Sequence, residues 1–266
     1  MLTGEAMGYL LPIMIVVGLW WLSTVFLLYR TGMPRSSSFM TLSVAVVGSL
    51  LGIFFILLSR GDYSVMGAYV AFVSALAIWS VHETSYLLGY VTGPRALACP
   101  PDVSPWRRFW YGVAASLYHE IAVVLTAGLI ALMTWDSPNR VALWTFTVLW
   151  LMRWSAKLNI FLGVRNLHSE YWPPDLQYLG SYARQKKMNV LFPWSVLGAA
   201  TGVVLMVLAA IESADDPTQR AAMMLVASIL SLALLEHLFL MLRIPDETLW
   251  RLGARSRSPG DLQEQP

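Results

Sequence analysis

Seven long apolar stretches constrain this chain more than any other feature, because each is long enough to cross a lipid bilayer as a helix. They cover approximately residues 8–29, 39–59, 63–91, 109–134, 141–164, 190–211 and 221–242. A backbone in hydrocarbon must satisfy its own hydrogen bonds, and the alternating pattern of a membrane β-barrel does not occur, so we expect helices. The content of 57% hydrophobic and 13% charged residues agrees. The predicted fold is an all-α polytopic membrane helix bundle with seven transmembrane helices.

The basic residues between the stretches predict how the bundle is oriented. Thirteen of them follow stretches one, three, five and seven, whereas the other connections hold one each, namely Arg60, Arg140 and Arg220. Because cytoplasmic loops carry the excess of lysine and arginine, we expect a periplasmic N-terminus and a cytoplasmic C-terminus. Residues 1–243 are predicted to form the transmembrane bundle, and residues 244–266 a short cytoplasmic tail.

The longest connection, at about residues 165–189, is predicted to be cytoplasmic and to lie at the membrane surface. Pro174 suits the first turn of a helix, and Leu176, Leu179 and Ala183 recur at helical spacing. This pattern favours a short amphipathic helix on the inner leaflet. A polar loop with incidental leucines and a docking site for a partner protein remain as alternatives.

Ionisable side chains inside four apolar stretches are the most informative residues for function, because charged types cost roughly 2.5–3.5 kcal/mol each at membrane depth. Three stretches carry a histidine beside a glutamate, and a fourth carries two cations: His82, Glu83, His119, Glu120, Glu236, His237, Arg153 and Lys157. At the rise of a helix, the charged residues are expected roughly 9–16 Å below the cytoplasmic boundary. We therefore predict one polar layer in the cytoplasmic half of the bundle.

Charge balance predicts contacts within this layer. Arg153 and Lys157 are four residues apart and share a helix face, so they repel each other unless carboxylates stand between them. Glu83, Glu120 and Glu236 are the only carboxylates expected at that depth. We predict a buried cluster of these three carboxylates and both cations, with the three histidines around it.

Several roles remain open for the layer. One is a structural clasp, in which buried ion pairs fix helix register and Asn159 adds an interhelical hydrogen bond. A second is a metal site for iron, zinc or manganese, with ligands drawn from His82, Glu83, His119, Glu120, Glu236 and His237. A third is ligation of the magnesium of a chlorin by one histidine, and a fourth is a path for protons or a solute.

Familiar enzyme signatures are missing from the sequence. It has no H-E-x-x-H, no E-x-x-H pair of the di-iron type, no nucleophile elbow, no P-loop and no dinucleotide fingerprint. Cys99 is the only cysteine, so an intrachain disulfide and a C-x-x-C motif are excluded. The net charge of +2 gives no sign of nucleic-acid binding. Ser85 and Ser155 are interpreted as helix-packing serines.

Three pairs of glycines stand four residues apart, a spacing that can let membrane helices approach closely. They are Gly48 and Gly52, Gly89 and Gly93, and Gly198 and Gly202. Because the motif is frequent, we interpret the pairs as ordinary bundle packing.

Several local motifs resemble one family. They are His82-Glu83-Thr84-Ser85, Gly93-Pro94-Arg95, Tyr118-His119-Glu120 and, most specific, Leu151-Met152-Arg153-Trp154-Ser155-Ala156-Lys157-Leu158-Asn159. On these residues the chain resembles the photosynthetic complex assembly protein PuhE family of purple bacteria. The likeness covers about residues 65–242, and the first two apolar stretches add little to it.

The resemblance implies a role beside the photosynthetic reaction centre, since the family's genes accompany that of the reaction centre H subunit. It implies help with assembly of the reaction centre and core antenna or with bacteriochlorophyll supply, in a bacterial inner (cytoplasmic or intracytoplasmic) membrane. The implied partners are reaction-centre and core-antenna subunits or pigment-synthesis proteins, and the implied cofactor is bacteriochlorophyll or a precursor. No established active site comes with the resemblance. A membrane-embedded, metal-dependent enzyme acting on a bacteriochlorophyll precursor or another lipophilic substrate is the alternative.

Overall fold

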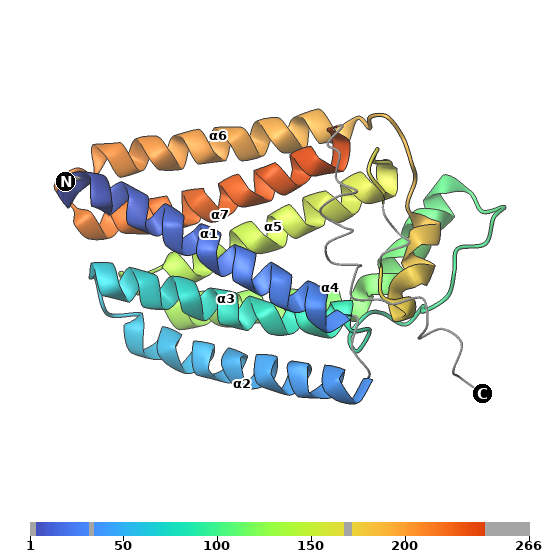
Figure 1. The fold of residues 1–266 in the computed structure, drawn as a ribbon, viewed down its shortest axis with the longest axis horizontal. Coiled ribbons are helices and arrows are strands. Elements are labelled where there is room, and N and C mark those ends of the chain that lie inside the picture. The colour runs from blue at the N-terminus through green and yellow to red at the C-terminus, as the bar shows by residue number, and fades with distance from the viewer. Residues whose placement is uncertain (1–3, 32–34, 168–171, 243–266) are drawn as a thin grey trace.

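The computed structural model describes residues 4–31, 35–167 and 172–242, and among these residues it contains seven long α-helices and a short 3₁₀ helix (Figure 1). In chain order they are α1 (Gly4–Thr31), α2 (Arg35–Ser59), α3 (Val65–Leu87), α4 (Pro105–Thr134), α5 (Val141–Leu162), η2 (Pro174–Tyr182), α6 (Leu191–Glu212) and α7 (Pro217–Met241). The predicted all-α bundle is confirmed. The predicted tail at 244–266 lies outside the described residues.

Most of the long helices have the length and composition of membrane spans. Within the described ranges six qualify, namely α1, α2, α3, α4, α6 and α7, so the chain has the character of a multi-pass membrane protein. The 22-residue helix α5, which carries Arg153 and Lys157, lies in the same bundle but is not among these six candidates. Length and composition thus support six spans, and the seventh depends on α5.

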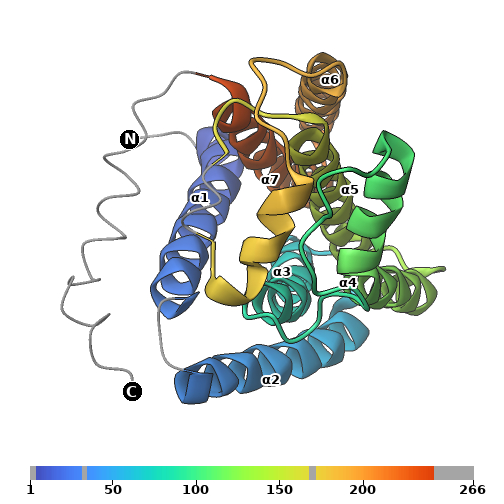
Figure 2. The same ribbon diagram turned by 90° about the vertical axis from the view of Figure 1, so that its right-hand side faces the viewer.

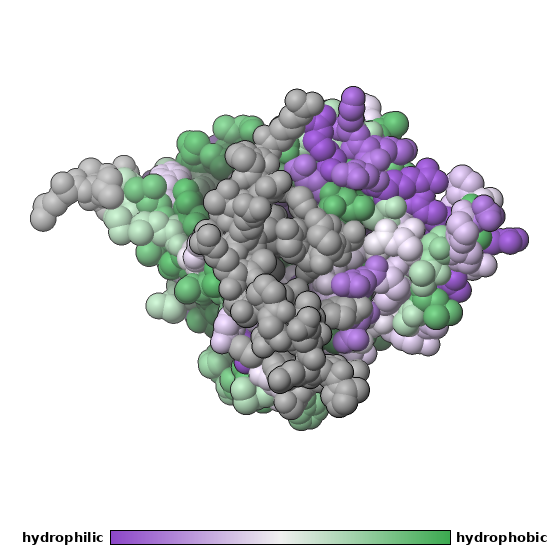
Figure 3. All heavy atoms as spheres, turned by 45° about the vertical axis from the view of Figure 1, so that its right-hand side comes forward, coloured by the Kyte–Doolittle hydropathy of each residue, from purple (hydrophilic) through white to green (hydrophobic). Residues whose placement is uncertain are grey.

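The connections between helices alternate between the two ends of the bundle (Figure 1). One end, called here the η2 end, carries η2 and the connecting residues 88–104, 163–167 and 183–190, and the other is called the opposite end. Figure 2 views the molecule from the η2 end and shows η2 lying across the ends of the long helices. On the face drawn in Figure 3, hydrophilic residues gather at this end.

Helix α3 ends at Leu87, four residues earlier than the apolar stretch suggested, because the chain turns at Gly89. The φ of Gly89 is +73°, a left-handed conformation that favours glycine, and the amides of Tyr90 and Val91 both donate to the carbonyl of Ser85. Apolar residues after Leu87 therefore belong to a turn and not to the span.

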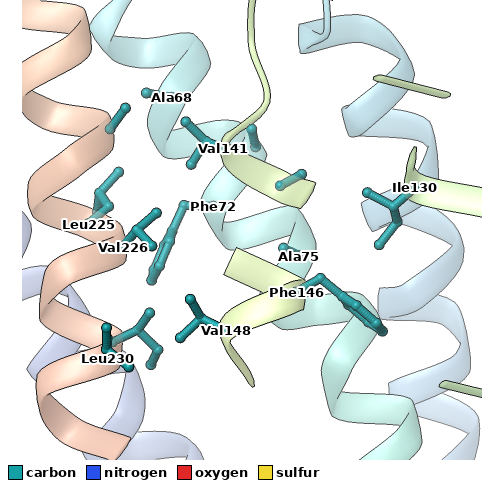
Figure 4. Packing of buried hydrophobic residues seen from close by; sticks show 14 of the residues in the cluster. Ala68, Phe72, Ala75, Ile130, Val141, Phe146, Val148, Leu225, Val226 and Leu230 are labelled. Atoms are coloured by element: carbon teal, nitrogen blue, oxygen red, sulfur yellow. The ribbon is translucent and has the colours of Figure 1, made fainter. Parts of the chain in front are cut away.

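The centre of the bundle is formed by α3, α5 and α7, which pack against one another. Figure 4 shows Phe72 of α3 beside Leu225 and Val226 of α7, with Val148 of α5 close by. Phe146 of α5 is also fully buried. Helix α2 packs mainly on α3, α6 packs mainly on α7, and α1 packs along α7. The three central helices are the ones that carry most of the predicted polar layer.

The η2 segment confirms a short helical element in the long connection, but it is a 3₁₀ helix that ends before Ala183. Its Leu176 is buried, and its Tyr182 hydroxyl donates to the carbonyl of Leu97 at 2.7 Å. The Arg95 guanidinium donates to the same hydroxyl at 3.0 Å, and Arg108 donates to the backbone carbonyl of Tyr182. These contacts fasten η2 to α4 and to the α3–α4 connection.

Candidate functional site in the η2 half of the bundle

The two cations of α5 each pair with a carboxylate of a neighbouring helix. Arg153 Nη2 lies 2.8 Å from Glu83 Oε2 of α3, and Lys157 Nζ lies 2.6 Å from Glu120 Oε1 of α4. The side chains of Glu83 and Glu120 are only 15% and 16% exposed. The predicted pairing of the α5 cations with carboxylates of neighbouring helices is confirmed. The two carboxylates are half-buried, and the two pairs link α3, α4 and α5.

Glu236 makes no ion pair with the α5 cations, unlike the predicted cluster, although it interacts electrostatically with Arg153 over a longer distance. Its Oε1 accepts a hydrogen bond of 2.9 Å from the indole of Trp20 on α1, and the described residues give it no ion pair. The reason is how α7 is rotated about its axis. His237, the next residue after Glu236, is buried in the bundle, so Glu236 points in another direction and is exposed on the side of α1. The three-carboxylate cluster is therefore two ion pairs plus a separate carboxylate.

The depths along the helices also differ from those predicted. Glu83 lies only four residues before the end of α3 because that helix ends at Leu87, while Lys157 and Glu236 each lie five residues before the ends of α5 and α7. Glu120 lies fifteen residues into α4, since α4 extends further at the η2 end. The two ion pairs show that Glu83 and Glu120 still meet the α5 cations at one level.

Aromatic side chains surround the ion pairs, and the sequence did not identify them. The ring of Tyr86 on α3 lies 4.6 Å from the ring of His119, and Lys157 Nζ lies 4.4 Å from the centre of the Tyr86 ring on which it sits. The indole of Trp154 donates to Glu120. Tyr86 could have been found as a residue one helical turn from Glu83, but not its contacts.

The three histidines occupy two different places. His82 and His119 lie together between α3 and α4, with ring centres 6.3 Å apart, and His82 Nε2 lies 3.0 Å from the hydroxyl of Thr126. His237 lies elsewhere, with Nε2 at 2.9 Å from the hydroxyl of Ser155 and Nδ1 at 2.8 Å from the carbonyl of Ala233. The structure therefore does not gather the histidines around one centre.

His237 belongs to a second hydrogen-bonded group, which links α5, α6 and α7. The Ser155 hydroxyl donates to Ser195 on α6 at 2.9 Å, and the Asn159 amide donates to the same Ser195 hydroxyl at 3.0 Å. The predicted interhelical hydrogen bond of Asn159 is confirmed. Ser155, interpreted from sequence as a packing residue, in addition connects His237 to this group.

Five buried polar atoms in and beside the layer have no hydrogen-bond partner. They are Glu83 Oε1, His119 Nδ1, Arg153 Nε, Asn159 Oδ1 and the hydroxyl oxygen of Tyr178 on η2. Such atoms are rare in folded proteins, because leaving one unsatisfied costs about 1–3 kcal/mol. Donors and acceptors both occur among them, so they suit water or a polar group that can both donate and accept.

The backbone of α4 is bound to the α3–α4 connection at the level of the layer. The amide of His119 donates to the carbonyl of Thr92 at 3.0 Å, and the neighbouring Gly93 lies against α4. A Cβ atom at Gly93 would stand 2.1 Å from the carbonyl oxygen of Ala114. This close approach requires glycine, and it sets the height of His119 and Glu120 relative to α3.

Neither a metal nor a chlorin fits the observed histidines well. Among the described residues no group of three histidine, cysteine, aspartate or glutamate side chains could hold a metal ion. His82, His119 and His237 are 8%, 1% and 2% exposed. A chlorin ring needs an open face beside its axial ligand, which such buried imidazoles do not offer. We therefore assign neither group to the layer.

Taken together, these features define a polytopic helical membrane protein with a buried, ion-paired polar layer. The family model described as "Protein of unknown function (DUF3623)" matches residues 6–261, and the chain belongs to this family. It is 38% identical over 239 residues to a protein of Rhodobacter capsulatus, a match that covers 87% of this chain and 85% of the relative. That relative is described as "Uncharacterized 30.4 kDa protein in puhA 5'region". No solved structure matches the chain.

Proposed function

We propose that this protein assists assembly of the photosynthetic reaction centre and core antenna, or the supply of bacteriochlorophyll to them. The support is the printed description of the Rhodobacter capsulatus relative, which places that protein in the 5' region of puhA. The motifs that resemble photosynthetic assembly proteins lie in the same helices as the polar layer. The function is accordingly sought in the membrane, at that layer.

In this proposal the layer is a functional site that binds part of a client molecule, and it does not serve only to hold the helices together. The observation that carries this is the set of buried atoms without partners, Glu83 Oε1, Arg153 Nε and His119 Nδ1 among them. A clasp needs only its ion pairs, and it gains nothing from unsatisfied groups beside them. A site that receives a polar group from a client does use such atoms.

The proposed orientation places the η2 end in the cytoplasm and the N-terminus in the periplasm, with α5 as the seventh span. The support is the excess of basic residues in the connections of the η2 end. Ion pairing lowers the cost of carrying Arg153 and Lys157 across the membrane within α5. Reporter fusions after Lys187 and after Asp216 are expected in opposite compartments, and the same compartment for both would rule out seven spans.

The functional test replaces His82, His119 and His237 singly with glutamine, which keeps some hydrogen bonding. Protein level in the membrane, thermal stability of the purified variant and yield of photosynthetic complexes are measured together. A working site predicts normal level and stability with reduced complex yield for at least one variant, and His119 is the first candidate because of its unpartnered nitrogen. His168, the remaining histidine of the chain, provides the matched control. Full complex yield for all three variants would mean that the layer has only a structural role.

A further inference from the structure

Glu236 is the carboxylate of the polar layer that makes no close ion pair among the described residues, although Arg153 attracts it from a longer distance. Arg153 and Lys157 are each committed to another glutamate, at 2.8 Å and 2.6 Å. Glu236 has one observed partner, the neutral indole of Trp20 at 2.9 Å. A carboxylate at membrane depth is expensive when no cation is in direct contact with it, which makes Glu236 a candidate binding group.

The surroundings of Glu236 are apolar and face outward. Trp21 on α1 is 58% exposed, and Leu235 and Phe239 on α7 are 40% and 41% exposed. Glu236 itself is exposed in the same region, beside the line where α1 packs along α7. The carboxylate is therefore presented within a surface that meets the hydrocarbon of the membrane or another membrane protein.

We propose that Glu236 and Trp20 form a docking point for a transmembrane helix of a partner protein that carries a basic side chain at this level of the membrane. The inference rests on the proposed function, and it names the kind of partner that the assembly role would involve. The Trp20 indole holds one carboxylate oxygen in place, which leaves the other to accept a charge-assisted hydrogen bond. The exposed apolar side chains beside it supply contact area for the helix.

Depth favours a helix over a lipid headgroup as the source of the positive charge. Glu236 lies five residues before the end of α7, which is about 7 Å below that end at the rise of an α-helix. Lipid amines lie above this level, in the headgroup region. A second copy of the chain also fails to supply the charge, because Arg153 and Lys157, its cations at this depth, are already paired.

The test uses the purified full chain in vesicles and a leucine–alanine transmembrane peptide with one lysine placed about five residues from its end. A peptide with norleucine in place of that lysine is the matched probe. Energy transfer between labelled protein and labelled peptide reports association. The lysine peptide is expected to associate about tenfold more tightly than the norleucine peptide with the unmodified protein.

Variants of the docking point decide the outcome. Glu236→Gln is expected to remove the preference for lysine, Glu236→Asp to keep most of it, and Trp20→Phe to weaken it. Glu212→Gln, at the exposed end of α6, and Trp135→Phe, at the exposed end of α4, lie away from the docking point, so these controls should change nothing. If Glu236→Gln does not fold, the contrast between Glu236→Asp and Trp20→Phe carries the test.

Three results would overturn the docking point. They are equal association of the two peptides, an unchanged preference for lysine in Glu236→Gln, and a preference that is lost when amine lipids are added to the vesicles. The last would assign the carboxylate to a lipid headgroup. None of these results touches the histidine variants, so failure of the docking point and failure of the assembly role can be told apart.

Discussion

The two halves of the bundle are built from the same central helices but are held together by different interactions. Toward the opposite end, α3, α5 and α7 meet through Phe72, Val141 and Leu225, all buried and apolar. Toward the η2 end, the same helices meet through Arg153 with Glu83 and through hydrogen bonds of His237. Apolar side-chain packing therefore holds the helices together in one half, and ion pairs and hydrogen bonds do so in the other.

This difference has a consequence that is specific to membranes. Lipid is as apolar as a leucine core, so the opposite half gains its stability from close packing and not from removal of water. The η2 half gains stability from ion pairs that would be costly to separate in hydrocarbon. Substitutions in the two halves are therefore expected to differ in size and in whether they affect function.

The largest expected effect is the loss of a single member of an ion pair. Arg153→Met leaves the Glu83 carboxylate buried and uncompensated, and we expect it to lower the free energy of unfolding by about 3–5 kcal/mol. Titration with a denaturing detergent, read by helix content, would measure this. The double variant Arg153→Met/Glu83→Leu should recover a large part of the loss, and Arg107→Gln, exposed at the start of α4, is the control. A stable single variant would show that the charges are not buried together.

Sequence was sufficient to predict the helices but not where each one ends. Periodic apolar stretches placed every long helix within about four residues, because length and hydropathy decide which segments enter a membrane. The end of α3 at Leu87 depended on the conformation of Gly89. A glycine in a hydrophobic stretch does not by itself predict a turn with a left-handed backbone conformation.

For the candidate site, the need to balance buried charges predicted the ion-pair partners better than the positions of the residues along the helices did. Two buried cations required nearby carboxylates, and Glu83 and Glu120 fulfil that requirement. Glu236 was assigned wrongly, because a shared depth does not fix the rotation of a helix about its axis. The contacts of Tyr86 and Trp154 could not be predicted, since they depend on how α3, α4 and α5 pack.

The second largest effect is expected at the closest approach between backbones in the η2 half. Gly93→Ala places a Cβ atom 2.1 Å from the carbonyl oxygen of Ala114, and the backbone of α4 must shift to admit it. We expect a loss of about 2–3 kcal/mol. Gly198→Ala is the matched control, because no heavy atom lies within 4 Å of its added Cβ. Thermal unfolding of both variants side by side would test this, and equal unfolding temperatures would contradict it.

A cavity in the opposite half should have a somewhat smaller effect and leave function intact. Phe72→Ala removes a fully buried ring between α3 and α7. A residual cavity of about 100 Å³ would cost about 2 kcal/mol, and the transfer of the ring to lipid adds little in a membrane. Phe54→Ala, on the exposed face of α2, should be close to neutral. Complex yield per molecule of folded Phe72→Ala should stay normal, and a reduced yield would break the functional distinction between the halves.

The smallest effect is expected outside the membrane, where α7 begins at the opposite end. The backbone amide of Gln219 first, then the hydroxyl of Tyr63, hold the pKa of the Asp216 carboxyl below its ordinary value. A carboxyl whose pKa is lower in the folded state stabilises the fold above its unfolded pKa of about 3.9, and this stabilisation is lost as the pH falls through the folded pKa.

Asp216→Asn keeps a side-chain oxygen for the cap but removes the charge, so it isolates this contribution. Unfolding temperatures should be measured from pH 7 down to pH 3. The unmodified protein should unfold at a slightly higher temperature than Asp216→Asn at neutral pH, and the two unfolding temperatures should become equal in acid. Asp215→Asn, at the exposed neighbouring position, should follow the unmodified protein throughout. A constant gap between Asp216→Asn and the unmodified protein would mean that the cap acts through shape and not through charge. Normal complex yield in Asp216→Asn would then separate the opposite end, which holds helices in place, from the η2 half, where the proposed site lies.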